Sequence, residues 1–151
     1  MRADKIKTFE FLEHKADVRF RAYGKSLEEA FANCIRVFTE LIEAEAKTSK
    51  ASKARRAISV SGRDIRALLY CFLEEVLFLI DSEGFLPEKA EGLTITYLDE
   101  VKGKGNTSYA LKAELIGKTA VIRSNPIKAV TYNQMEIHEG NPYYVEVVMD
   151  T

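Results

Sequence analysis

The chain has 151 residues, of which 46% are hydrophobic, and a formal net charge of −1. This length is typical of one domain with a substantial core, and the near-zero charge excludes a global field that would attract nucleic acid. No apolar run reaches the roughly 18 residues that a membrane span needs, and the first residues lack the apolar stretch of a signal peptide. We therefore expect a single cytoplasmic domain over residues 1–151, without membrane contact.

The first third of the chain predicts two strands followed by a helix. Residues 7–13 alternate apolar and polar side chains, and ADVRFRAYG (16–24) continues the alternation up to Gly24, as half-buried strands do. Ser26 and Glu29 form a capping box at the start of SLEEAFANCIRVFTELIEAEA (26–46), in which apolar residues recur at helical spacing. The spacing predicts one amphipathic helix over this whole stretch.

The middle of the chain predicts a basic loop, a short strand and a second helix. KTSKASKARR (47–56) has no apolar periodicity, so we interpret it as a loop, either a solvated connector or an RNA or partner contact; its cations are Lys47, Lys50, Lys53, Arg55 and Arg56. AISVSG (57–62) is typical of a short strand. RDIRALLYCFLEEVLFLIDSEG (63–84) predicts a helix that ends at Gly84. Both cysteines, Cys34 and Cys71, fall on apolar helix faces, so we expect buried reduced thiols.

The last third predicts two hairpins. GLTITYLDEV (92–101) and TSYALKAELIG (107–117) flank the Gly-rich KGKGN, which lacks the frame of a phosphate-binding loop. IKAVTYNQMEIH (127–138) and YYVEVVMDT (143–151) flank EGNP. Two long amphipathic helices need a sheet face on which to bury their apolar stripes. The sequence therefore predicts an α+β fold of two layers, with a mostly antiparallel sheet of about six strands and both helices on one face.

Acidic residues stand where one predicted strand begins and another ends. Asp17 opens the strand 16–24, and Asp150 is followed by Thr151, where we expect a terminal carboxylate. Neighbouring anions raise each other's pKa, which a cation relieves. If the two strands lie side by side, three hard oxygen groups converge, and these suit Ca²⁺ or Mg²⁺ better than zinc. The simpler interpretation of Asp150 and Thr151 is a frayed polar tail.

Three further residues have two interpretations or a minor role. His14 either orients a turn or Asp17, or is a softer metal ligand, and Glu13 is either a turn residue or a support for the ligands. Lys128 is either a solvated strand lysine or a phosphate contact. The sequence contains no GxSxG, no HExxH and no Cys–His pair with usable spacing, so it shows no nucleophile motif, and a stand-alone metal hydrolase is only a minor alternative.

Four segments together resemble the archease family: HKADVRFRAYGKSLEEAF (14–31), RDIRALLYCFLEEVLFLIDSEG (63–84), PIKAVTYNQMEI (126–137) and VVMD (147–150). The resemblance runs in order over essentially the whole chain. It implies a small cytoplasmic α+β protein that assists the RtcB-type tRNA-splicing ligase in tRNA processing and reaches tRNA through that ligase. It also implies an activator rather than an enzyme, because archeases promote guanylylation and turnover of the ligase and broaden its nucleotide use. The alternative is a chaperone or modulator of proteins that process DNA or RNA.

The resemblance also implies a site. Archeases carry a divalent metal, reported as calcium, and the family's ligand positions fall on Asp17, Asp150 and Thr151 of this sequence. The lysine that matters for ligase activation falls on Lys128. Asn133 stands where family members often have His, and because an amide does not shuttle protons at neutral pH, acid–base chemistry is in doubt there. The resemblance leaves the oligomeric state and the ligase-contacting face open.

Overall fold

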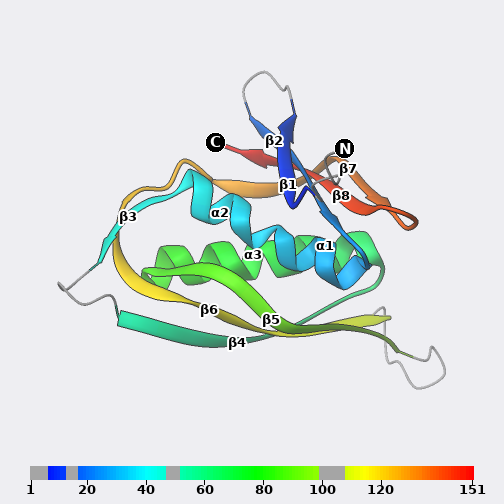
Figure 1. The fold of residues 1–151 in the computed structure, drawn as a ribbon, viewed down its shortest axis with the longest axis horizontal. Coiled ribbons are helices and arrows are strands. Elements are labelled where there is room, and N and C mark those ends of the chain that lie inside the picture. The colour runs from blue at the N-terminus through cyan, green and yellow to red at the C-terminus, as the bar shows by residue number, and fades with distance from the viewer. Residues whose placement is uncertain (1–6, 13–16, 47–51, 99–107) are drawn as a thin grey trace, which may run out of the picture.

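A layer of helices lies between two antiparallel sheets in the computed structural model, which describes residues 7–12, 17–46, 52–98 and 108–151 (Figure 1). Sheet A has the strand order β1-β2-β8-β7, with bounds Phe9–Leu12, Val18–Gly24, Tyr143–Asp150 and Ala129–His138. Sheet B joins three strands to β6 (Tyr109–Ser124), namely β3 (Glu43–Ala46), β4 (Ser52–Gly62) and β5 (Phe85–Tyr97). All of the strand pairings in both sheets are antiparallel.

The α+β class and the antiparallel pairing predicted from the sequence are confirmed, but the layers are arranged differently. The described part of the chain has eight strands in two sheets instead of about six in one sheet. The first and the last helix are covered from both sides: the first contacts β2, β8 and β5, and the last contacts β4, β5, β6 and β7. The apolar stripes of the helices are too wide for one sheet to bury, so a second sheet is needed on the opposite side.

The predicted first helix is divided into α1 (Leu27–Asn33) and α2 (Ile35–Leu41). Its predicted start is confirmed, because the Ser26 hydroxyl accepts a hydrogen bond from the Glu29 N–H at 3.1 Å. At Cys34 the backbone N–H bonds to the Phe31 carbonyl at 3.1 Å, a tight turn that breaks the helix. The prediction of helix up to residue 46 is wrong, since Glu43–Ala46 is strand β3 and pairs with β6.

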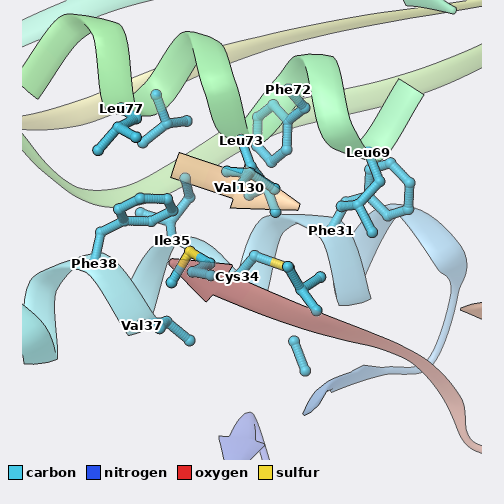
Figure 2. Close-up of a cluster of buried hydrophobic side chains, with 14 of the residues drawn as sticks. Phe31, Cys34, Ile35, Val37, Phe38, Leu69, Phe72, Leu73, Leu77 and Val130 are labelled. Atoms are coloured by element: carbon cyan, nitrogen blue, oxygen red, sulfur yellow. The ribbon is translucent and has the colours of Figure 1, made fainter. Parts of the chain in front are cut away.

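Helix α3 (Ile65–Glu83) ends at Gly84, as the sequence predicts, and begins two residues after the start of the predicted stretch 63–84. The Asp64 carboxylate accepts from the Ala67 N–H at 2.8 Å, and Gly84 ends the helix with a φ of 64°. Its apolar side chains face those of α1 and α2 across the middle of the molecule (Figure 2). The rings of Phe31 and Phe72 stack there with centroids 6.3 Å apart. This common core holds the two sheets at fixed positions on either side.

Sheet B corrects the prediction of a basic loop over 47–56. Residues 47–51 lie outside the described residues, but β4 already begins at Ser52 and pairs with residues 109–119 of β6, next to the stretch 120–124 that pairs with β3. Arg55 and Arg56 are therefore strand residues, paired with Glu114 and Glu83. Both arginines are partly neutralised, which weakens the interpretation of this stretch as an RNA contact.

The two predicted hairpins are confirmed, and the first is longer than expected. Its strands, β5 and β6, pair from Phe85 to Tyr97, while the KGKGN segment lies outside the described residues. Both cysteines are free: Cys34 is buried, as predicted, whereas Cys71 is only partly buried. Burial raises the pKa of the Cys34 thiol above its usual value. None of the helices in the described part of the chain combines the length and apolarity that a bilayer crossing requires.

Candidate functional site

Strand β8 brings together the chain segments in which the sequence placed its candidate residues. Val18 at the start of β2 pairs with Met149 near the end of β8. On the other side of β8, Ala129 pairs with Asp150, and the Lys128 N–H donates to the Asp150 carbonyl at 2.7 Å. The predicted neighbourhood of the early strand and the tail is therefore confirmed at the level of strand pairing. Asp17, Asp150 and Thr151 mark one end of sheet A, which we call the acidic corner.

The acidic corner offers only a small number of hard oxygen ligands. Asp17 directly precedes β2 and Asp150 ends β8, so their carboxylates come from adjacent strands. Carboxylate oxygens are the ligands that Ca²⁺ and Mg²⁺ prefer. Within the described ranges, no group of three or more His, Cys, Asp or Glu side chains is placed to hold a metal ion. The residues therefore fit a hard cation in chemistry, with an oxygen of Thr151, water or a partner's oxygens needed to complete its coordination.

Some predicted residues lie elsewhere or outside the described residues. Glu13 and His14, the neighbours of Asp17 in sequence, belong to the segment 13–16, which the structure does not describe. Asn133 lies further along β7 and is exposed, and its backbone N–H donates to the Thr131 hydroxyl at 3.2 Å. The departure from the family pattern at Asn133 therefore lies several residues along the strand from the acidic corner.

Beside Asp17 lies a shallow hollow of about 230 Å³. It is mostly apolar and is lined by Phe11, Leu12, Asp17, Val18, Arg19 and Leu41. Phe11 is one of the few large apolar residues whose side chain is substantially exposed, at 46%. A carboxylate and an open apolar surface thus stand next to each other at this end of sheet A.

A buried ion-pair cluster, which the sequence analysis missed, stands next to the acidic corner on sheet A. Glu146, in the middle of β8, accepts a hydrogen bond from Arg19 Nη2 at 2.8 Å and another from Arg21 Nε at 2.7 Å. The Glu146 side chain is only 2% exposed. Burial alone would raise its pKa, but the hydrogen bonds from Arg21 and Arg19 outweigh burial and hold the pKa of Glu146 below its usual value.

The cluster ties β2 to β8 close to the acidic corner. Arg19 stands two residues after Asp17, and Glu146 stands four residues before Asp150. The Arg21 guanidinium also lies over the Tyr144 ring, 4.1 Å from its centroid. A signal for the cluster exists in the sequence: arginines alternate along the polar face of one predicted strand, and a glutamate occupies the polar face of another. The signal becomes specific only when the register pairs the two strands.

Comparisons with known proteins agree with the resemblance of the sequence segments. Residues 9–151 match the model of the Archease protein family. The chain is 36% identical over 153 residues to a protein named archease from Sulfurisphaera tokodaii, with 96% of this chain and 99% of that protein covered.

Two solved structures share the fold. One is the solution structure of a Methanobacterium thermoautotrophicum protein, with a TM-score of 0.68, 30% identity, and coverage of 97% of this chain and 100% of the other. The second is the crystal structure of an archease, described as a possible chaperone, from Thermotoga maritima. Its TM-score is 0.53 at 22% identity, with 100% of this chain and 98% of that chain covered, and it supports the fold alone.

Proposed function

Because this chain belongs to the archease family, we propose that it activates an RtcB-type tRNA-splicing RNA ligase in the cytoplasm. In this proposal the chain is not itself the ligase: it promotes guanylylation and turnover of the ligase and broadens the nucleotides that the ligase accepts. The working surface is the acidic corner together with Lys128. The observation that carries the proposal is the pairing of both β2 and β7 with β8, which gathers Asp17, Asp150 and Lys128 at one end of sheet A.

The acidic corner would hold a divalent cation, Ca²⁺ in our proposal, through the carboxylates of Asp17 and Asp150 and through Thr151. When bound, the cation supplies a positive charge that attracts phosphate oxygens. Lys128 adds a second positive group beside the cation. Its backbone N–H is hydrogen-bonded to the Asp150 carbonyl, which places it at the acidic corner, and its side chain is exposed. An ammonium group on a flexible stem suits contact with a phosphate of the nucleotide that the ligase consumes.

The hollow beside Asp17 supports a protein partner at the same place. Its exposed apolar wall, formed in part by Phe11 and Leu41, suits an apolar side chain of the ligase. A partner seated on this wall would bring its own oxygen groups close to the acidic corner. The partner's oxygen groups would then complete the coordination of the cation at the interface.

The test is multiple-turnover RNA ligation with a purified cognate ligase, with and without the full chain. We expect Asp150→Asn and Lys128→Met each to reduce stimulation at least tenfold, and a chelator to reduce stimulation by the wild-type chain. Lys112→Met is the matched control, since Lys112 is an exposed lysine on the outer face of sheet B. If Asp150→Asn and Lys128→Met both stimulate as well as the wild type, the acidic corner is not the working surface.

Calcium binding is measured separately by calorimetry on the chain alone. We expect Asp17→Asn and Asp150→Asn to weaken binding, and Lys128→Met to leave it intact or slightly stronger, because a nearby positive charge is removed. This pattern would separate the metal-holding residues from the phosphate-contacting lysine. Equal calcium binding by the wild type and by both aspartate variants would remove the metal from the proposal.

A chaperone or modulator of proteins that process DNA or RNA is the second candidate function. It is favoured by large apolar residues exposed on five different elements, namely Phe11, Phe78, Tyr97, Val121 and Tyr132. In that case a chelator would leave ligase stimulation unchanged, while the chain would suppress aggregation of the heated ligase. A chelator-sensitive stimulation without any effect on aggregation argues against this candidate.

A further inference from the structure

Two tyrosines from different layers stack at the seam between α3 and β7. The rings of Tyr70 and Tyr132 lie nearly parallel, 10° apart, with centroids separated by 4.5 Å. Tyr132 is nevertheless 47% exposed. Because Tyr70 covers one face of the Tyr132 ring, this exposure belongs to the opposite face and the ring edge. The pair is thus a flat aromatic surface, backed by a long helix and open to solvent.

The backbone of β7 is shaped so that it presents Tyr132. The register with β8 shifts between Thr131 and Glu136, and Gln134 in this bulge has a φ of 56°, which is unusual for a residue with a side chain. Helix α3 holds the strand on both sides of the bulge. The Glu74 carboxylate accepts from the Val130 N–H at 3.0 Å, and the Arg66 guanidinium donates to the Met135 carbonyl. The position of Tyr132 is therefore set by rigid elements on both sides.

A pocket of about 350 Å³ adjoins the exposed part of Tyr132 and is lined by Arg63, Asp64, Arg66, Ala67 and Tyr132. The carboxylate of Asp64 is engaged with the first turn of α3. Across residues 7–12, 17–46, 52–98 and 108–151, no salt bridge to Arg63 or Arg66 is formed. Burial is the main cause that raises the pKa of Tyr132, and the nearby Cys71 and Asp64 raise it further. The phenol therefore stays neutral and does not repel an anion.

We propose that this pocket binds a nucleotide unit, with its base stacked on Tyr132 and its phosphate held by Arg63 and Arg66. Stacking on an aromatic ring is tolerant of base identity, and guanidinium groups bind phosphate oxygens through paired N–H donors. The ligand is either one residue of a single-stranded RNA or a free nucleotide. An RNA strand would continue toward Lys128, which stands four residues earlier and directly precedes β7, about 13 Å away at strand spacing.

One end of sheet B, where β5 ends and β6 begins, provides a matched pair of tyrosines in an acidic setting. Tyr97 and Tyr109 are in contact with centroids 5.1 Å apart and rings tilted by 66°. Tyr97 is 59% exposed. Their pocket is lined by Glu28 and Glu139 in place of arginines. This second site offers similar exposed aromatic area with the opposite charge, so a phosphate is repelled from it.

The experiment is fluorescence anisotropy of the full chain with a labelled six-nucleotide single-stranded RNA at low salt, in calcium-free buffer. We expect Tyr132→Ala to weaken binding at least tenfold, Tyr132→Phe to keep it within twofold, and Arg63→Met to weaken it and reduce its salt dependence. Tyr97→Ala should bind like the wild type. Unfolding curves of each variant report whether the chain is still folded, and Arg63→Met removes only an exposed side chain.

Competition with unlabelled GTP or GMP distinguishes the two sources of the ligand. A strand is the ligand if affinity grows with RNA length and mononucleotides compete poorly, and a free nucleotide is the ligand if GTP competes as well as the RNA. Unchanged RNA binding by Tyr132→Ala and Arg63→Met, or an equal loss in Tyr97→Ala, would overturn the proposal. Because no ligase or metal is present, failure here is independent of the ligase-activation test.

Discussion

Sheet A and sheet B carry the same kind of ion pair in different surroundings. On sheet A, the side chain of Glu146 is 2% exposed and is held by Arg19 and Arg21, each 29% exposed. On sheet B, Arg55 and Glu114 pair across β4 and β6 with side chains 60% and 45% exposed. An exposed pair contributes about 0–1 kcal/mol, whereas removing one partner of a buried pair costs about 3–5 kcal/mol. The same contact thus matters for stability only where water is excluded.

The two sheets also differ in what holds their strands together. Sheet A depends on side chains that bridge β2 and β8 next to the acidic corner. In sheet B the backbone of β5 approaches β6 very closely at Gly117, where an added Cβ would overlap the carbonyl oxygen of Leu86 and lie 2.8 Å from the Cα of Pro87. Sheet B is therefore sensitive to steric change in its backbone, and sheet A to loss of charge.

The largest effect is expected from Gly117→Ala. The added methyl group meets backbone atoms, which yield little, so we expect a loss of about 3 kcal/mol in the free energy of unfolding, measured by urea denaturation. Gly92→Ala is the control in the same sheet. A Cβ there meets nothing within 4 Å, and the φ of 61° alone should cost about 1 kcal/mol. Equal losses in the two variants would show that backbone proximity does not limit sheet B.

The next effect is expected from Glu146→Gln on sheet A. Removing the negative charge leaves two arginines facing a neutral amide, and because both are partly hydrated we expect a loss of about 2–3 kcal/mol in unfolding free energy. Glu114→Gln removes the matched charge on sheet B and should cost less than about 1 kcal/mol. Similar losses in both variants would show that burial does not set how much each ion pair contributes to stability.

The pH dependence of stability sharpens the same comparison. The pKa of Glu146 is lowered in the folded chain, below the usual value of a glutamate. A carboxylate with a lowered folded pKa stabilises the fold fully above its unfolded pKa, and this stabilisation is lost as the pH falls through the folded value. We therefore expect the stability gap between the wild type and Glu146→Gln to narrow from pH 7 to pH 3, by about 1.4 kcal/mol for each unit by which the folded and unfolded pKa values differ. Thermal unfolding followed by circular dichroism measures this gap, and a constant gap would contradict the assigned shift.

The smallest effect is expected from Asn133→His, which restores the residue that the family often carries. Asn133 is exposed, and its hydrogen bond to Thr131 is made by the backbone. The free energy of unfolding should change by less than about 0.5 kcal/mol, and the calcium affinity measured by calorimetry should stay within twofold. A larger change in calcium affinity would show that the β7 bulge and the acidic corner are energetically coupled.

Part of the site was predictable from the sequence and part was not. The residues of the acidic corner were named from motifs, because Asp17 and Asp150 stand at the limits of clearly alternating strands. Their neighbourhood follows from the pairing of β2 with β8, which joins residues more than a hundred positions apart. Glu146 could not be singled out from the sequence, since its burial depends on arginines that the register places beside it.

The sequence by itself determined the features that act over a few residues: the helix cap at Ser26, the stop at Gly84 and the alternation of β2. These signals are local because a cap or an alternating pattern needs no partner from elsewhere in the chain. Only the tertiary structure decided that Glu43–Ala46, a segment of helix-favouring residues, becomes a strand. The open edge of β6 offers its backbone groups to that segment, and satisfying hydrogen bonds across the sheet outweighs the small intrinsic preference for helix.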